Sequence, residues 1–465
     1  MSPTFTTTMP PPPPDLEKSS TPLPDPSDLT TYPEGGTRAW LVVLGAWCGL
    51  TASIGLYNTT GVFSVIISNT ILTSSSSTSI GWIFSIYAFM VWIVGVWVGP
   101  CFDVFGPRML MMAGMFCTVL GMICLSFCTG GFVPLFCIFL AFSLLTGLGS
   151  SLLLTPSMAC VAHWFDARRG LASGIAWTGG GVGGVLFPLL IQGLLPHLGW
   201  AWCIRITAFI LLFLCIISIL FCRSRIPPPN RKHATSPWRA TLPDYRIFLD
   251  DTGAMAFTTL GVLFVDLAYF IPITYLPSYY LSRQNLPTSS TISGSAAFGY
   301  QLLAILNASS CFGRLISGSL GDHFGHYNTI IISLLLCVVS IFALWLPDIV
   351  TTSSDSPVLL IIFVIIFGFV SGSNVSLTPI CLGQLCDIRD YGRYYASCYT
   401  VVAFGVLVSL PAAGGILDVC GGGGGKDGKG DFWGVAVFTG GCYGIALGCF
   451  VWVRGRVVGW RWCKW

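Results

Sequence analysis

The chain has 465 residues, of which 54% are hydrophobic and only 9% are charged, against roughly 25% charged residues in soluble domains. A soluble core could not bury so much apolar surface, so the composition predicts a protein that lies in a lipid bilayer. The formal net charge of +3 is too small to indicate a nucleic-acid partner, and no basic run interleaved with aromatic residues is typical of a polyanion groove.

The first 36 residues have a different composition from the rest of the chain. They contain a proline run from Pro10 to Pro14 together with many Ser, Thr and Asp residues. They lack the basic start and the apolar core of a signal peptide. We therefore predict a disordered cytoplasmic tail over residues 1–36.

Apolar stretches long enough to cross a bilayer, about 20 residues each, recur along the chain. They cover residues 39–66, 80–101, 108–128, 132–160, 170–196, 200–222, 252–281, 296–317, 328–346, 357–380, 395–416 and 432–453. The pattern predicts an all-α membrane protein with twelve transmembrane helices in two six-helix bundles. The predicted parts are a bundle over 37–222, a cytoplasmic loop over 223–251, a second bundle over 252–453 and a cytoplasmic tail over 454–465.

Basic residues set the predicted orientation, because Lys and Arg are retained on the cytoplasmic side. With the N-terminus inside, seventeen basic residues fall in inner segments. Only Arg205, Arg283, Lys426 and Lys429 fall in outer ones. We expect a multi-pass protein with both termini cytoplasmic, and the plasma membrane as its location.

Several patterns that suggest enzyme or cofactor chemistry have structural explanations. The nineteen cysteines lie singly in apolar runs without a zinc spacing, as expected of small buried hydrophobes. Gly179, Gly181 and Gly184 form a GxGxxG pattern, but it lies inside an apolar span and lacks the following acidic residue, which favours close helix packing. His163 is expected in a solvated loop. We predict neither an enzyme, nor a cofactor, nor a metal site.

The two halves of the chain carry matching motifs. Gly99, Asp103 and Gly106 recur as Gly318, Asp322 and Gly325, 219 residues later and at the same place in the second half. The triplet LTP occurs at 154–156 and again at 377–379, and a weaker match pairs Asp166 and Arg168 with Asp387 and Arg389. Duplicated six-span halves are typical of an alternating-access transporter.

These motifs resemble those of the major facilitator superfamily. GPCFDVFGPR, ending at Arg108, resembles its loop between helices two and three. EGGTRAW at 34–40 resembles the opening of the monocarboxylate porter family, and RRGLASG at 168–174, with Arg169, resembles its fungal members. The resemblance implies a twelve-helix transporter whose loop motifs latch the bundles together when the cavity is open to the outside.

Two positions depart from the animal monocarboxylate porters. Asn58 stands where those proteins have a lysine, and Ser310 stands where they have an aspartate four residues before the helix-eight arginine, which Arg314 matches. The machinery that the resemblance implies for lactate and proton cotransport is therefore incomplete.

Two ionisable residues lie deep in predicted spans, where charge is costly and marks function. Arg314 lies eight residues before Asp322, about 12 Å deeper on a helix, and is the candidate for binding an anionic substrate. Its alternative role is to bond carbonyls near the helix end. Asp266 lies about 12 residues into the seventh span and is the candidate for proton coupling or substrate contact. A locally satisfied packing role is its alternative.

Further polar residues inside the spans are candidates for lining the cavity. They are Asn58, Asn307, Ser310, Asn374 and Tyr269. Hydrogen bonding between helices is the alternative for the asparagines.

The sequence thus predicts a gradient-driven secondary transporter for a small organic solute, expected to be an anion such as an organic acid or secondary metabolite, with efflux slightly favoured. Protons are the expected coupling ion, and no obligate protein partner is expected. Uptake of a monocarboxylate or vitamin-like nutrient and a non-transporting sensor remain alternatives. Because Tyr327 replaces Arg108 in the second motif copy, Asp103→Asn is expected to impair transport more than Asp322→Asn.

Overall fold

The computed structural model describes residues 33–72, 77–128, 134–225, 245–249, 252–284, 295–351, 357–387, 390–420 and 432–459. Within these ranges all regular structure is helical, and they contain no strand. Most of the predicted N-terminal tail, most of the central loop and the last six residues lie outside the described ranges.

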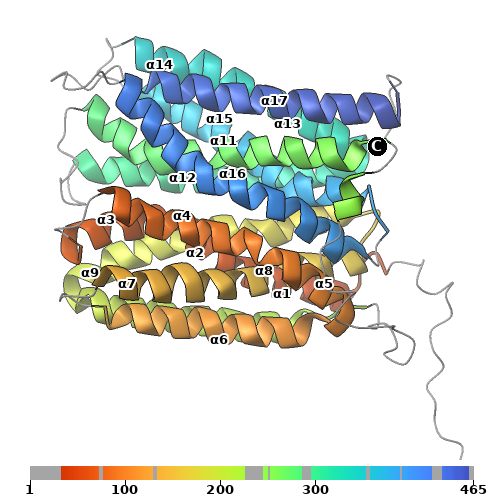
Figure 1. Cartoon of the computed structure of the whole chain (residues 1–465), viewed down its shortest axis with the longest axis horizontal. Helices are drawn as coiled ribbons and strands as arrows, with labels where there is room; N and C mark the ends of the chain where they lie inside the picture. The colour runs from red at the N-terminus through yellow and green to blue at the C-terminus, as the bar shows by residue number, and fades with distance from the viewer. Residues whose placement is uncertain are drawn as a thin grey trace, which may run out of the picture. The chain divides into compact units, whose positions relative to one another are not determined.

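The first half of the chain forms a series of helices that run back and forth (Figure 1). They are α1 (Thr37–Leu50), η1 (Thr51–Gly55), α2 (Leu56–Asn58), α3 (Thr60–Thr70), α4 (Ser77–Ile93), α5 (Gly95–Phe105), α6 (Pro107–Ser126), α7 (Pro134–Ile138), η2 (Phe139–Thr146), α8 (Gly147–Trp164) and α9 (Arg169–Phe221). The η elements in this half are π-helical turns inside longer helices, so α1 to α2 and α7 to α8 are continuous crossings.

The second half repeats this arrangement after a short turn, η3 (Tyr245–Phe248). Its helices are α11 (Ala254–Arg283), α12 (Ser295–Phe324), α13 (His326–Ser340), η4 (Ile341–Trp345), α14 (Leu346–Val350), α15 (Val358–Gly383), α16 (Tyr391–Cys420) and α17 (Trp433–Val457).

The prediction of twelve membrane helices is confirmed. Ten helices of the described residues are long and apolar enough to cross a bilayer. One of them, α9, has 53 residues and contains a break at Gly199, whose φ of 69° is not helical, so α9 supplies two crossings. The remaining crossing is α12, which has 30 residues and carries Arg314 and Asp322 within it.

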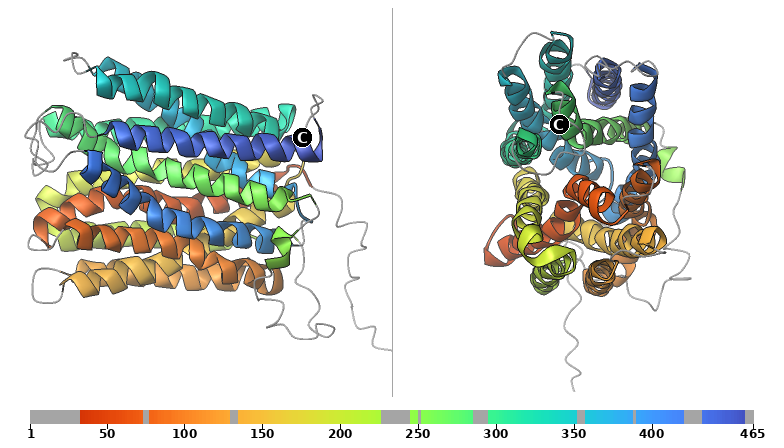
Figure 2. Two further views of the ribbon diagram at one scale, coloured as in Figure 1. Left: turned by 45° about the horizontal axis from the view of Figure 1, so that its top comes forward. Right: turned by 90° about the vertical axis from the view of Figure 1, so that its left-hand side faces the viewer.

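Two groups of helices supply most of the contacts between the halves. In one, α9 of the first half packs along α12 of the second. In the other, α4 and α5 pack against α16 (Figure 2). Within each half, α1 packs on α9, and α11 packs on α16 and α17. These contacts leave α9, α12, α4 and α16 around the centre of the molecule, where a site shared by both halves can form.

The outward faces of the helices are apolar. Large side chains such as Trp97, Phe116, Phe213, Leu335 and Phe404 are between 50% and 64% exposed. Exposed apolar side chains at this density would be unfavourable in water, but they are the expected surface of helices that contact lipid.

The glycine-rich segment of α9 lets helices approach closely. A Cβ atom added at Gly179 would collide with the carbonyl oxygen of Trp47, and one at Gly183 would collide with Gly55. Gly181 faces α12 at Cys311 in the same way. The GxGxxG pattern is therefore a packing surface for η1, α1 and α12, as the sequence favoured.

A buried polar cluster ties α11 to α14 at the end of the molecule away from Asp103 and Asp322. Arg283 Nη1 lies 2.8 Å from both carboxylate oxygens of Asp348. Tyr279 donates its hydroxyl to the same carboxylate at 2.6 Å. The Asp348 side chain is only 1% exposed, so it depends on these donors for the hydrogen bonds that water would otherwise supply.

Asp348→Ala should lower the free energy of unfolding by about 3 kcal/mol, because it removes the shared acceptor of Tyr279 and Arg283. The measurement is the midpoint of thermal unfolding of the purified protein in detergent. Asp387→Ala, at an exposed position, is the matched control and should leave the midpoint unchanged. Equal midpoints for both variants would show that the cluster does not stabilise the fold.

Candidate functional site: a central pocket and its gate

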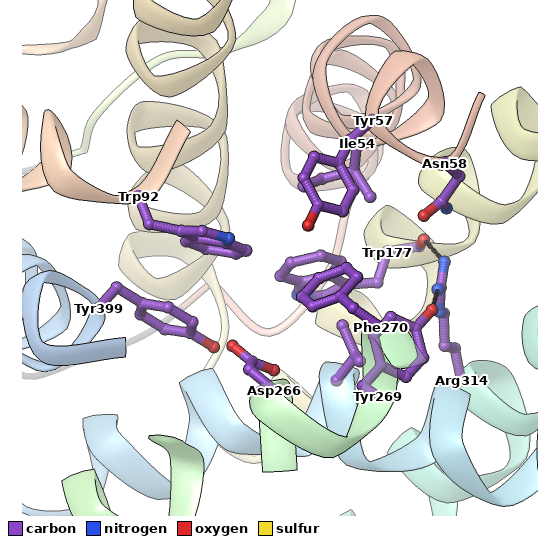
Figure 3. Close-up of a pocket in the computed structure, with 11 residues that line it drawn as sticks. Ile54, Tyr57, Asn58, Trp92, Trp177, Asp266, Tyr269, Phe270, Arg314 and Tyr399 are labelled. Atoms are coloured by element: carbon purple, nitrogen blue, oxygen red, sulfur yellow. Dashed lines mark hydrogen bonds between the residues drawn. The ribbon is translucent and has the colours of Figure 1, made fainter. Parts of the chain in front are cut away.

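A narrow cavity lies between the two halves (Figure 3), and the total space among its lining atoms, open solvent included, is about 330 Å³. It is lined by Ile54, Tyr57, Asn58, Trp92, Trp177, Asp266, Tyr269, Phe270, Arg314, Val375 and Tyr399. These residues come from η1, α2, α4 and α9 of the first half and from α11, α12, α15 and α16 of the second. Both ionisable residues that the sequence placed deep in the membrane therefore line one pocket.

Arg314 is completely buried and only partly satisfied. Its Nη1 donates to the carbonyl oxygen of Trp177 at 2.6 Å, and its Nη2 donates to the hydroxyl of Tyr269 at 3.4 Å. Its Nε has no hydrogen-bond partner among the described residues. No carboxylate in the described ranges forms an ion pair with this guanidinium, so its charge is balanced only by dipoles.

Asp266 lies on α11 at the other side of the pocket from Arg314. The residue is 5% exposed, and its Oδ2 has no hydrogen-bond partner within the described part of the chain. Figure 3 shows the carboxylate directed toward Trp92 and Tyr399, with Phe270 between it and Arg314. Since the two ionisable groups are not paired, each is available to a bound solute or ion.

Aromatic rings form most of the remaining walls. Trp92 and Tyr399 are stacked with centroids 4.6 Å apart and planes 15° apart. Tyr57 and Phe270 meet edge to face at 4.8 Å. A second narrow cavity shares Tyr57, Asn58 and Phe270 with the first. The Tyr57 and Phe270 rings therefore lie between the central pocket and this outer cavity.

The other polar candidates divide into two groups. Asn58 and Tyr269 line the pocket, and Asn58 also donates to the carbonyl oxygen of Gly180 at 3.1 Å. Asn307, Ser310 and Asn374 are fully buried but do not line this cavity.

Local contacts account for these three residues in part. Asn307 donates to Leu303 of its own helix at 3.1 Å, and Asn374 donates to the Cys337 sulfur at 3.3 Å. The Ser310 hydroxyl lies where a Cβ atom of Gly372 would be. Their contacts in this structure are those of helix packing.

The sequence did not single out Trp92, Trp177, Phe270 or Tyr399. Aromatic residues are frequent in all the spans, and no spacing distinguishes these four from the rings that face lipid. Only the packing of α4, α9, α11 and α16 brings them to one cavity.

The duplicated motifs meet at one end of the molecule, which we call the hinge end and define by Asp103 and Asp322. The Asp322 carboxylate accepts the backbone N–H groups of Gly170 at 2.7 Å and Leu171 at 2.8 Å. The Asp103 carboxylate accepts the backbone N–H of Arg393 at 3.1 Å. Each aspartate thus binds the first turn of a helix in the opposite half, where N–H groups lack helical partners and the dipole favours an anion.

The motif glycines repeat their roles as well. A Cβ atom at Gly99 would collide with the Gly392 carbonyl, and one at Gly318 would collide with the Gly170 carbonyl. Gly106 and Gly325 each precede a helix with φ values of 78° and 95°, a conformation that favours glycine. The sequence repeat is therefore a repeat of contacts between the halves.

The other predicted gating residues have unequal surroundings. Arg169 is buried with its guanidinium 4.7 Å from the centroid of the Tyr391 ring, across the two halves. Arg108, Asp166, Arg168 and Asp387 are exposed. Arg389 lies outside the described residues.

The segment Glu34–Gly36 also lies at the hinge end. The Glu34 carboxylate accepts the backbone N–H groups of Asp166 at 2.9 Å, Ala167 at 2.7 Å and Arg168 at 3.1 Å. These hydrogen bonds stabilise the turn that precedes α9. The first turn of α9 is the one that Asp322 caps.

His163 corrects the expectation of a solvated loop residue. It lies within α8, is 5% exposed, and its Nδ1 is 2.9 Å from the hydroxyl of Ser224. Its ring packs against Phe102 at 5.4 Å. The helix continues past the apolar run that the sequence showed, which carries His163 into the packed interior.

A polar pocket between two sets of membrane helices, with paired helix caps at one end, is the architecture of an alternating-access transporter. The sequence model of the Major Facilitator Superfamily matches residues 46–353, and the chain belongs to this superfamily of transporters.

Two relatives and one solved structure illustrate this membership. The chain is 32% identical over 451 residues to the riboflavin transporter MCH5 of Saccharomyces cerevisiae, covering 94% of this chain and 82% of that protein. It is 34% identical over 386 residues to the fujikurins efflux protein of Gibberella fujikuroi, covering 83% and 77%. The transporter FucP, solved in the outward conformation, shares the fold with a TM-score of 0.63 at 14% identity, covering 90% and 98%.

The two aspartates have different additional contacts at the hinge end. Asp322 binds two backbone N–H groups and also lies 3.1 Å from Nε2 of His326. Asp103 accepts the backbone N–H of Arg393 at 3.1 Å and has a second backbone hydrogen bond with Gly392. Both copies of the motif therefore cap the first turn of a helix in the opposite half.

Asp322→Asn should accelerate hydrogen–deuterium exchange of the Gly170 and Leu171 amides by about tenfold or more, because charged hydrogen bonds are lost. Asp103→Asn should have a similar effect at the start of α16, on the Gly392 and Arg393 amides. Exchange mass spectrometry of the purified protein measures both, with Arg456→Gln, at an exposed position, as the control. Unchanged exchange in either variant would show that its aspartate does not hold the two halves together.

Proposed function

We propose that this protein is a gradient-driven secondary transporter that moves a small organic anion through the central pocket by alternating access. The observation that carries the proposal is Arg314, a fully buried cation that lines the pocket without a carboxylate partner among the described residues.

The physical argument rests on the cost of a buried charge. An arginine in a protein does not lose its proton, so Arg314 remains cationic. A cation near the centre of a membrane helix costs at least about 2.5 kcal/mol unless a partner or water offsets it. One carbonyl and one hydroxyl supply part of this compensation. An anionic solute would supply the missing countercharge.

Protons are the proposed coupling ion, and Asp266 is the proposed carrier. Its Oδ2 is buried without a partner and can hold a proton when the pocket faces one side and release it when the pocket faces the other. Because Asp266 is separated from Arg314, its proton and a solute bound at Arg314 could occupy the pocket together.

The caps at the hinge end are the proposed gate. In this structure Asp103 and Asp322 hold the halves together at that end, which we assign to the cytoplasmic side from the distribution of basic residues. Opening toward the cytoplasm requires both caps to separate as the halves rock. The contact between Tyr57 and Phe270, which separates the pocket from the outer cavity in this structure, would then remain closed.

Efflux of a secondary metabolite or organic acid is the favoured direction. A relative named as an efflux protein aligns with most of this chain at 34% identity, which supports that reading. Uptake is the second candidate, because a relative named as a riboflavin transporter aligns with 94% of the chain.

Two variants should separate solute binding from proton coupling in liposomes that contain the purified protein. Arg314→Gln should abolish solute exchange, because the countercharge for the anion is lost. Asp266→Asn should retain exchange of solute for solute but abolish proton movement driven by a solute gradient. Arg456→Gln, at an exposed position outside the pocket and the gate, should behave as the unmodified protein.

The probes are a panel of aromatic and aliphatic monocarboxylates, with a pH-sensitive dye inside the vesicles and protein-free vesicles to correct for passive entry. The absence of solute flux under every imposed pH or solute gradient would refute the transporter proposal. Unchanged proton movement in Asp266→Asn would refute only the coupling role.

A further inference from the structure

We infer that the pocket selects a planar aromatic anion, with its ring held by aromatic walls from both halves and its acidic group at Arg314. This inference rests on the proposal that the pocket binds the transported solute, and it names the class of that solute. Three independent features of the pocket carry it: the composition of the walls, the origin of the stacked rings and the excess of hydrogen-bond donors.

The walls offer flat surfaces to a ligand. Six of the eleven lining residues are aromatic, whereas Ile54 and Val375 are the only aliphatic ones in the lining. A conjugated ring gains both buried area and favourable stacking geometry against such surfaces. A saturated chain of the same size gains the area alone.

Two pairs of aromatic rings bridge the two halves. Trp92 lies on α4 and Tyr399 on α16, and their nearly parallel rings stack face to face at one side of the pocket. Tyr57 and Phe270, on α2 and α11, close the opposite side toward the outer cavity. A flat solute lying between these pairs would contact both halves at once, so its binding would be sensitive to their rocking.

The polar groups of the pocket are mainly donors. The indole Nε1 atoms of Trp92 and Trp177 are buried and have no hydrogen-bond partner in the described ranges, and an indole nitrogen can only donate. Arg314 Nε adds a third donor without a partner there. Against these, Asp266 is the one acidic group in the lining.

This balance distinguishes an anion from a cation. Aromatic cages also bind organic cations through the ring faces, usually with acidic support. Here Asp266 would supply such support, but Arg314 would repel the cation, and the indole donors would remain unsatisfied. An aromatic anion with acceptor oxygens satisfies the donors and the charge together.

The test compares the affinities of three probes for the full-length protein in lipid nanodiscs, measured by titration calorimetry. The probes are 2-naphthoate, decahydro-2-naphthoate, which has the same carbon skeleton without aromatic rings, and N-methylquinolinium, a planar aromatic cation. We expect 2-naphthoate to bind about tenfold more tightly than its saturated analogue, and the cation to bind most weakly.

Substitutions at Trp92 test whether this side of the pocket causes the preference for 2-naphthoate. Trp92→Leu should remove the tenfold preference for 2-naphthoate and leave decahydro-2-naphthoate affinity nearly unchanged, whereas Trp92→Phe should retain most of it. Trp97→Leu is the matched control, because Trp97 lies five residues further along the same crossing and is 53% exposed. Unfolding midpoints measured for each variant establish that the pocket is intact.

Equal affinity for 2-naphthoate and its saturated analogue, tighter binding of the cation, or a preference that survives Trp92→Leu would each overturn the inference. The binding test and the flux test can fail independently of each other. Flux of aliphatic and aromatic acids at equal affinity would leave transport standing and refute aromatic selection. Selective binding without flux in liposomes would refute transport and leave the selectivity in place.

Discussion

The binding of aspartate carboxylates to helix N-termini across the two halves is the interaction on which the arrangement of this molecule depends. Asp322 holds the first turn of α9, and Asp103 holds the first turn of α16. Inside a membrane protein the exposed N–H groups of a helix start have few other acceptors, so a carboxylate there is strongly favoured. By closing the halves at the hinge end, these contacts bury the central pocket and bring α9 against α12.

The pocket itself is defined by polar groups that the packing leaves incompletely satisfied. Arg314 has dipoles but no countercharge, Asp266 is separated from it, and two indole donors have no acceptor among the described residues. In the other buried cluster of charged groups, the Arg283 guanidinium is paired with the Asp348 carboxylate. This contrast explains why the central cavity, and not the other buried polar cluster, supports a proposal of solute binding.

Much of the architecture could be predicted because membrane helices leave direct signals in composition. The twelve crossings follow from apolar length, and Gly199 breaks α9 between the predicted fifth and sixth spans. Arg314 and Asp266 could also be found, since charge deep in a span is rare. Asn307, Ser310 and Asn374 were selected by the same rule, but polarity alone does not tell which side of a buried helix faces a cavity. His163 was misplaced because α8 extends beyond its apolar run.

The sequence alone determined the class of fold, the number of crossings, the duplicated loop motifs and the two deep charges, because each depends on local composition or on a repeat along the chain. The tertiary structure decided which residues share the pocket, that Trp92 and Tyr399 stack across the two halves, and that Asp322 and Asp103 each cap a helix of the opposite half. These features depend on the rotation and close approach of helices far apart in the chain, which glycines such as Gly99 and Gly318 permit but do not specify.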